Sequence, residues 1–228
     1  MVHLQEKGLS LYSEDFSQIN LTKNPDLKEM AEYYYKLAAD GIVRSPKFPS
    51  ETWMGDEFTK DTSPIVQYGY WFSAMAEGDV NKGNVMLLPA PTWTGKRLDP
   101  TITATGTVIS AATKHPEEAW KLFEYYSGGL PATTRAKSGW GVPALKSMYP
   151  LMPTGTPFQK QANAVLLNEL QYANTPVSFN PYLTETAVTD SWKKNLTEAL
   201  KGNITLDQLL DNVEVEINEA IKDGIDRV

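Results

Sequence analysis

The spacing of apolar residues predicts helices in five parts of the chain. In each part, apolar side chains recur every three or four positions, which is typical of a helix that buries one face. The predicted helices lie within residues 25–40, 116–128, 158–166, 188–201 and 206–221. Because three of them follow one another at the end of the chain, the last third is predicted to be mostly helical.

Capping residues support several of these helix starts. Asn24 precedes Pro25, and proline is well tolerated in the first turn of a helix. Thr205 and Gln208 have the spacing of a capping box. In the helix that starts at Pro116, the face that we expect to be buried consists of Ala119, Trp120, Phe123 and Tyr126.

Three shorter apolar runs predict strands, at residues 65–68, 84–91 and 105–113. The second run is interrupted and ended by prolines, and Gly106 in the third run would permit another part of the backbone to approach closely. A few strands among many helices are typical of α/β or α+β proteins.

The segment PIVQYGYWFSAMAEGD, residues 64–79, places four aromatic rings around Gly69. The rings are those of Tyr68, Tyr70, Trp71 and Phe72. They lie between a predicted strand and a predicted helix, where ligands bind in open α/β sheets. A single aromatic residue is more often part of a core. Because four rings in five positions cannot all point inward, at least one is a candidate for ligand contact.

Composition and charge narrow the class of protein. The chain has 228 residues, a net charge of −7 and a pI near 5.0, which argues against nucleic acid or an anionic membrane surface as a partner. It contains no cysteine, which excludes a disulfide framework and a thiolate nucleophile. We find no apolar run long enough to span a membrane, and no export signal in this sequence.

Candidate catalytic chemistry is sparse. His3 and His115 are the only histidines, and neither lies in a recognisable cluster. Asp56, Glu57 and Asp61 could supply paired carboxylates, although a solvated acidic loop is the favoured explanation. We therefore predict no catalytic residue, no metal site and no cofactor.

Several segments occur in an order that is known from one family. They are LTKNPDLKEMAEYYYKLAADG, IVQYGYWF with a G-x-W turn, NVMLLPAP, TGTVISAATKHPEEAWKLFEYYSG, GWGVPALKS and LKGNITLDQLLDNVEVEINEAI. Over residues 8–222 the chain resembles the C-terminal part of the family 1 extracellular solute-binding proteins, the maltose-binding-protein-like class that serves carbohydrate ABC importers. The sequences that the family has at its front, an export signal and much of its first lobe, do not occur here, so we expect a fragment.

The resemblance implies an α/β fold of the periplasmic-binding-protein type II, with two lobes, of which most of the N-terminal lobe would be missing. Residues 1–103 would form the first part of the C-terminal lobe. Residues 104–154 would form hinge strands and a segment of the N-terminal lobe, with hinges near Gly106 and Pro153. Residues 155–228 would form the helical end of the C-terminal lobe.

The resemblance also implies a function. The chain would be the carbohydrate-binding component of a bacterial ABC transporter, and it would not be an enzyme. It would bind a sugar, with an oligosaccharide favoured, in a cleft between the lobes and deliver it to the permease subunits in the membrane. The protein would be extracellular or periplasmic, with a lipid anchor in its full-length form.

By the same resemblance, Tyr70 and Trp71 would line the cleft and stack on a sugar ring, while Tyr68 and Phe72 would belong to the core. The other ligand-binding residues that we predict are Thr105, Gly106, Trp140, Asn180 and Tyr182. We expect no ligand contact from the remaining tryptophans, Trp53, Trp93, Trp120 and Trp192. Two alternatives stay open: a glycoside-active enzyme that uses the acidic residues at 56–61, and a carbohydrate-binding module without a role in transport.

Overall fold

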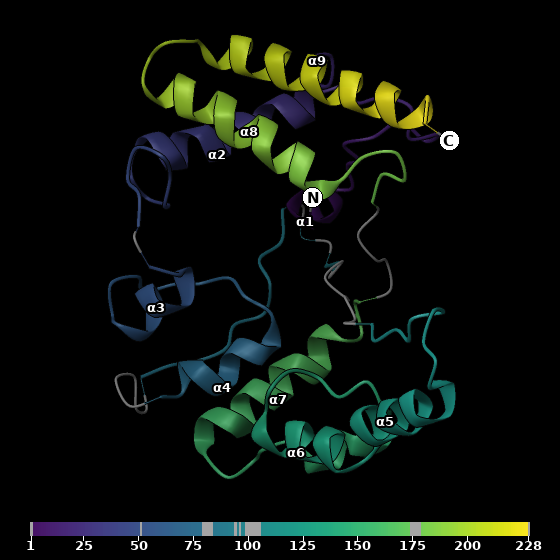
Figure 1. Ribbon diagram of the computed structural model, residues 1–228. Coiled ribbons are helices and arrows are strands. Elements are labelled where there is room, and N and C mark those ends of the chain that lie inside the picture. Colours follow the sequence, from purple (N-terminus) through teal and green to yellow (C-terminus); the bar gives the residue numbers. More distant parts are fainter. Residues whose placement is uncertain are drawn as a thin grey trace. The chain divides into compact units, whose positions relative to one another are not determined.

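The computed structural model describes residues 2–50, 52–78, 84–93, 95, 97–98, 106–173 and 179–227, and its regular elements are helices (Figure 1). The chain divides into two compact units. Unit 1 consists of residues 1–51, 92–100 and 177–228, and unit 2 consists of residues 52–91 and 101–176. The lobe boundaries predicted at residues 103 and 154 differ from these unit boundaries, and the assignment of segments to lobes stays a prediction.

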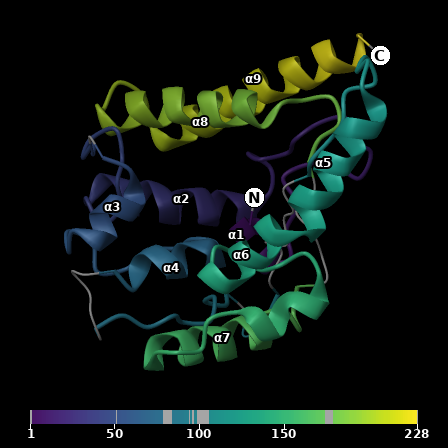
Figure 2. The same ribbon diagram turned by 60° about the horizontal axis from the view of Figure 1, so that its bottom comes forward.

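Unit 1 contains α1 (Val2–Glu6), α2 (Pro25–Ala39), α8 (Glu185–Leu200) and α9 (Leu206–Ile225). Helices α8 and α9 lie side by side in both Figure 1 and Figure 2. The apolar stripe of α9 is buried, with Leu209, Leu210, Val213, Ile217 and Ile221 each at most 1% exposed. Residues from the N-terminal part of the chain pack against this stripe, namely Leu11, Tyr12, Ile19, Leu21 and Leu27. Distant parts of the sequence therefore build one core.

The predicted capping residues are confirmed. The Asn24 side-chain oxygen accepts hydrogen bonds from the backbone N–H groups of Asp26 and Leu27, at 3.1 and 3.3 Å. Thr205 and Gln208 form the predicted capping box, in which each side chain accepts from the other residue's backbone N–H. These bonds satisfy N–H groups that have no partner within the helix.

A polar network joins α8 to α9. The Glu216 carboxylate accepts hydrogen bonds from Ser191 Oγ at 2.8 Å and from Lys194 Nζ at 2.6 Å. The buried Asn195 donates to both oxygens of the same carboxylate, at 3.3 and 3.4 Å. Burial raises the pKa of Glu216, but the bonds from these three side chains outweigh burial and hold the pKa below its ordinary value of 4.5.

Unit 2 is built from shorter elements: α3 (Met54–Thr59), the 3₁₀ turn η1 (Tyr70–Phe72), α4 (Ser73–Ala76), α5 (Pro116–Gly128), α6 (Leu130–Ser138), the 3₁₀ turn η3 (Lys146–Leu151) and α7 (Pro157–Glu169). Glu77, at the end of α4, accepts hydrogen bonds from the side chains of Thr156 and Gln159 at the start of α7. The positive end of the α7 dipole favours the negative charge of Glu77 at the start of α7. The two hydrogen bonds fix α4 to α7.

The predicted strands are wrong within the described residues. These residues contain no β-ladder and only two isolated β-bridges, Tyr12–Ile19 and Ser45–Phe48. A strand needs the backbone of a neighbouring strand as its hydrogen-bond partner. In the segment 84–91, a side chain takes that role: the Leu87 N–H donates to Gln161 Oε1 at 3.0 Å, and Gln161 Nε2 donates to the Leu87 carbonyl at 2.6 Å. The predicted α/β class is therefore not confirmed.

The predicted buried face of α5 is also wrong. No residue of α5 is buried, and Trp120 and Tyr126 are about half exposed. The helix contacts α6, where the Arg135 guanidinium lies 4.5 Å from the centre of the Tyr126 ring. An amphipathic pattern shows only that one side of a helix is suited to burial. Burial itself requires an opposing apolar surface, and in the described part of the chain α6 covers little of this face.

Val213 and Val215 on α9 offer a matched test of the unit 1 core. Val213 is 0% exposed and Val215 is 55% exposed. Val213→Ala should lower the free energy of unfolding by about 1 to 3 kcal/mol, because it removes buried methyl groups and leaves a cavity. Val215→Ala should be neutral or slightly stabilising, because alanine has the higher helix propensity. Urea denaturation would measure both, and equal losses at the two positions would contradict the described packing.

The Glu216 network predicts a stability effect that depends on pH. A folded-state pKa below the ordinary value means that the carboxylate stabilises the fold above pH 4.5, and that this contribution is lost as the pH falls through the lowered pKa. Glu216→Gln should therefore destabilise the protein at about pH 7, and the difference from the wild type should shrink toward about pH 3. Denaturation across this range would measure it, with the exposed Glu219→Gln on the same helix as control. A difference that stays constant with pH would count against the network.

Candidate functional site

Six aromatic side chains of unit 2 contact one another around η1. This ring cluster consists of Trp53, Phe58, Tyr68, Trp71, Phe72 and Trp140. The Trp71 ring lies 6.0 Å from the Trp53 ring, at an interplanar angle of 17°, and 5.5 Å from the Trp140 ring. Trp71 and Trp140, which were predicted separately as ligand-binding residues, are thus brought into contact.

Two glycines make room for two of the indole rings. A Cβ atom at Gly69 would lie 2.7 Å from Trp71 Nε1, and a Cβ atom at Gly55 would lie 2.2 Å from the six-membered ring of Trp53. Both distances are too short for a real contact. The glycine of the G-x-W turn is therefore required because the Trp71 ring folds back over it, and its backbone conformation, with φ of −64°, is one that other residues adopt.

Trp140 is presented by a turn that needs two glycines. Gly139 and Gly141 have φ values of +73° and +83°, in the left-handed region that favours glycine. Gly139 ends α6, and the Gly141 N–H donates to the Gly139 carbonyl at 2.9 Å. The indole of Trp140 remains 53% exposed although it touches Trp71. The sequence GWG therefore forms a tight turn that holds an aromatic ring at the surface.

The members of the ring cluster differ in burial. Phe72 is buried, as predicted, and Tyr68 is partly exposed and stacks on it at 5.1 Å. Trp71 is partly exposed, and Trp53 is more exposed, at 40%. The cluster therefore has an internal side around Phe72 and an accessible side formed by tryptophan rings. Exposed tryptophans that contact one another are unusual on a protein surface and mark a candidate binding site.

Tyr70 contacts other residues of unit 2, and its ligand role stays a prediction. Its hydroxyl donates to the Asn163 side-chain oxygen on α7, and Asn163 Nδ2 in turn donates to the Pro153 carbonyl at 2.8 Å. Burial raises the pKa of the Tyr70 hydroxyl, and a hydrogen bond with Ser73 opposes this effect. The side chain thus fixes η1 to α7, and it can support the position of Trp71.

A small cavity lies beside Tyr70. It has a volume of about 20 Å³ and is lined by Tyr70, Glu77, Gly139, Pro153 and Gln159, among others. A cavity of this size has room for about one water molecule and none for a sugar ring. Ligand binding at the ring cluster would therefore use the outer surface of the rings.

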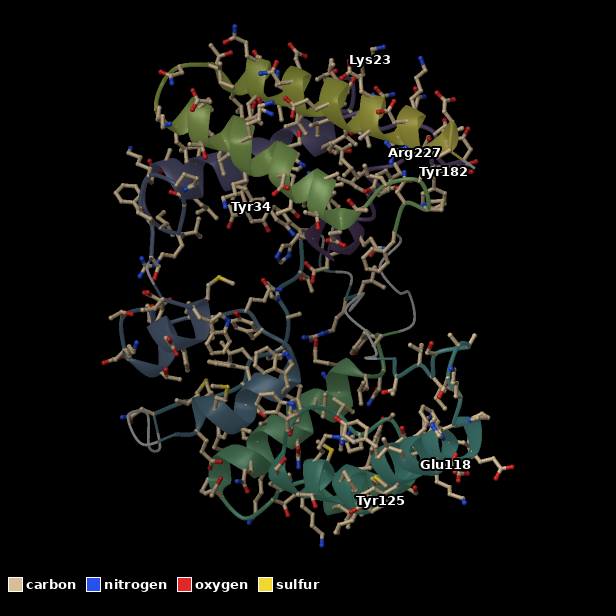
Figure 3. All side chains as sticks on the ribbon, in the orientation of Figure 1. Lys23, Tyr34, Glu118, Tyr125, Tyr182 and Arg227 are labelled. Atoms are coloured by element: carbon tan, nitrogen blue, oxygen red, sulfur yellow. The ribbon has the colours of Figure 1, made fainter. Side chains whose placement is uncertain are left out.

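The remaining predicted ligand residues do not join the ring cluster. Thr105 lies outside the described residues, and Gly106 is exposed with open space around it. Asn180 belongs to unit 1, where its buried side chain donates to the Phe16 carbonyl at 2.9 Å and accepts from the Tyr182 N–H at 2.8 Å. Tyr182 lies in the loop before α8 and packs partly against the core of unit 1 (Figure 3). Their ligand roles stay predictions, and the internal bonds of Asn180 disfavour its role.

Two of the three acidic residues near α3, Glu57 and Asp56, contact other side chains. Glu57 is buried and accepts hydrogen bonds from Thr52 Oγ1 at 2.8 Å and from Thr62 Oγ1 at 3.0 Å. Asp56 lies 3.7 Å from the ammonium group of Lys60. The described residues contain no group of three or more acidic, histidine or cysteine side chains arranged to hold a metal ion. Within the same residues, no helix has the length and apolar character needed to cross a membrane.

Comparisons with known proteins identify the fold. No protein-family model matches the sequence, and no curated protein matches it. Among solved structures, the ABC substrate-binding protein Lmo0181 from Listeria monocytogenes, in complex with cycloalternan, matches 96% of this chain with a TM-score of 0.71 and 19% identity. The maltose-bound T. maritima MalE3 matches 96% of this chain with a TM-score of 0.60 and 17% identity. This chain spans 55% of the length of each.

The chain is therefore similar in fold to ABC sugar-binding proteins over the part that it spans. This confirms the predicted resemblance at the level of fold. Trp53, from which no ligand contact was expected, stacks on Trp71 and so belongs to the ring cluster. A signal for this contact in the sequence is Gly55, a glycine two positions after a tryptophan.

Gly69→Ala tests the role of this glycine beneath the Trp71 ring. The backbone at residue 69 can accommodate alanine, but the added Cβ would displace the indole, so we expect a loss of about 1 to 3 kcal/mol in the free energy of unfolding. Gly128→Ala is the control, because a Cβ there meets no atom within 4 Å and favours the helix. Thermal and urea denaturation would compare the two. If Gly69→Ala were as stable as Gly128→Ala, the described ring position would be wrong.

Proposed function

We propose that the chain is the carbohydrate-binding part of an ABC importer, and that the ring cluster contacts the sugar through Trp71 and Trp140. One observation carries the proposal: two tryptophans from distant segments meet at 5.5 Å, with the Trp140 indole 53% exposed. The likeness of the fold to ABC sugar-binding proteins supports it. Both solved structures contain a bound saccharide, cycloalternan in one and maltose in the other.

The chemistry of indole rings suits this ligand class. A pyranose ring has an apolar face of C–H groups and a rim of hydroxyl groups, so it needs a rigid apolar plane with polar groups nearby. Tryptophan provides such a plane with few rotatable bonds. Each stacking contact contributes about 0.5 to 1.5 kcal/mol, while micromolar affinity requires about 8 kcal/mol. Several rings and additional hydrogen bonds are therefore needed.

The finer features follow the resemblance and are part of this proposal. The ligand would be an oligosaccharide bound between two lobes of an α/β protein, and the chain would supply part of that protein. Permease subunits in the membrane would receive the ligand from the closed form. The protein would act outside the cell or in the periplasm, held by a lipid anchor in its full-length form. Gly106 and Tyr182 would contribute further ligand contacts.

The two alternative functions are less well supported. A glycoside-active enzyme would need a free pair of carboxylates, whereas Glu57 is buried and bonded to two threonines. The burial and the hydrogen bonds of Glu57 therefore disfavour a catalytic pair that includes this residue. A carbohydrate-binding module without a role in transport would use the same rings, and it would differ by binding sugar without a change of shape.

Trp140→Ala tests the proposal, with Trp120→Ala as a matched control because both indoles are 53% exposed and both belong to unit 2. Trp140→Ala should weaken carbohydrate binding by about 1 to 3 kcal/mol, or about 5- to 150-fold, while the melting temperature changes little. Trp120→Ala should leave affinity unchanged. Isothermal titration of the 228-residue chain with gluco-, galacto-, manno- and xylo-oligosaccharides would measure both.

Two results would count against the proposed function. The first is that the wild-type chain binds no saccharide of the panel. The second is that Trp120→Ala and Trp140→Ala weaken binding equally, because the ring cluster would then have no special role.

A further inference from the structure

Trp53 is held in a defined position although it lies at the surface. Its ring is nearly parallel to the Trp71 ring at 6.0 Å, and it meets the Phe72 ring edge-on at 5.8 Å. A third neighbour is Tyr68, at 5.5 Å. Three rings thus fix the orientation of an indole that is 40% exposed. A fixed and accessible aromatic plane is what stacking on a ligand requires.

Two local features near Trp53 work against helix stability and favour the position of its ring. Trp53 occupies the N-cap of α3, where Ser, Thr, Asp or Asn would stabilise the helix, and its side chain makes no cap hydrogen bond. Gly55 lies inside α3, where glycine costs about 1 kcal/mol relative to alanine. If residue 55 had a Cβ atom, this atom would occupy the space of the Trp53 indole. The local sequence thus gives up helix stability for contacts that hold one indole in place against three other rings.

The tryptophan rings together are larger than one sugar. Trp53 and Trp140 both contact Trp71, at 6.0 and 5.5 Å between ring centres. One pyranose ring has about the size of one six-membered aromatic ring. It can therefore stack on only one of these three tryptophans. A ligand must therefore contain more than one sugar unit to use both Trp53 and a neighbouring ring.

We propose that Trp53 forms an additional stacking subsite beside Trp71 and makes the ring cluster selective for oligosaccharides over shorter sugars. This inference rests on the proposed function. Trp71 and Trp140 contact the first part of the ligand, one sugar unit to each ring, and Trp53 stacks on a further unit. Affinity therefore rises with chain length, and the rise depends on Trp53.

A chain-length series tests this inference. The wild-type chain, Trp53→Ala and the control Trp120→Ala would be titrated calorimetrically with monosaccharides up to hexasaccharides of whichever panel sugar the wild type binds. In the wild type, affinity should increase by about 2- to 10-fold once the ligand reaches the Trp53 subsite. Trp53→Ala should lack this increase, so that the ratio of its affinities for long and short ligands stays near one. Trp120→Ala should retain it.

The outcomes separate this inference from the proposed function. If the wild type binds sugars and Trp53→Ala weakens all chain lengths equally, or weakens none, the subsite is wrong and the proposed function stands. If the wild type binds no saccharide at any length, both are wrong. Melting temperatures of the variants show whether they are folded. Trp53→Phe, which keeps a smaller ring in the same place, should recover part of the chain-length dependence, and a failure to recover it would contradict a stacking role.

Discussion

The rest of the structure depends on the burial of one apolar stripe, that of α9. The side chains of this stripe are almost fully buried, and their partners come from α8 and from the N-terminal part of the chain. Because unit 1 draws on such distant segments, residues 52–91 and 101–176 must leave it and return. In the order of the sequence, unit 2 therefore consists of two insertions into unit 1. Closing these loops costs conformational entropy, which the burial around α9 offsets.

The structural features that were predicted correctly are those that depend on residues close to one another in the sequence. Helix α9 and its capping box follow from the spacing of leucines and from Thr205 and Gln208, all within one segment. The strand predicted at 84–91 was wrong because a strand depends on a distant partner, and here the Leu87 backbone pairs with a side chain of α7. The buried face predicted for α5 was wrong for a similar reason, since amphipathic spacing does not supply the surface that would cover it.

The same holds for the candidate site: features within one segment could be predicted, and contacts between segments could not. Trp71 was predicted from the resemblance of its G-x-W turn and Trp140 from its place between two glycines, but the contact between their rings could not be derived from either segment alone. The place of Trp53 in the ring cluster could not be derived from the sequence, because it depends on space left by Gly55 and on rings contributed by residues 68–72. The indoles of Trp53 and Trp71 lie close to the backbone because Gly55 and Gly69 have no side chain there. The candidate site depends on this arrangement.

The contacts of Trp53 and Trp140 with Trp71 have a spectroscopic consequence. Indole rings at 5.5 to 6.0 Å exchange excitation energy readily, so these three residues behave as one coupled chromophore. Their emission is sensitive to the polarity next to the exposed rings, whereas Trp192, packed against the core of unit 1, reports on the fold. Three intrinsic fluorophores therefore lie at the candidate site, and their emission adds to that of the exposed Trp93 and Trp120, which lie outside the ring cluster.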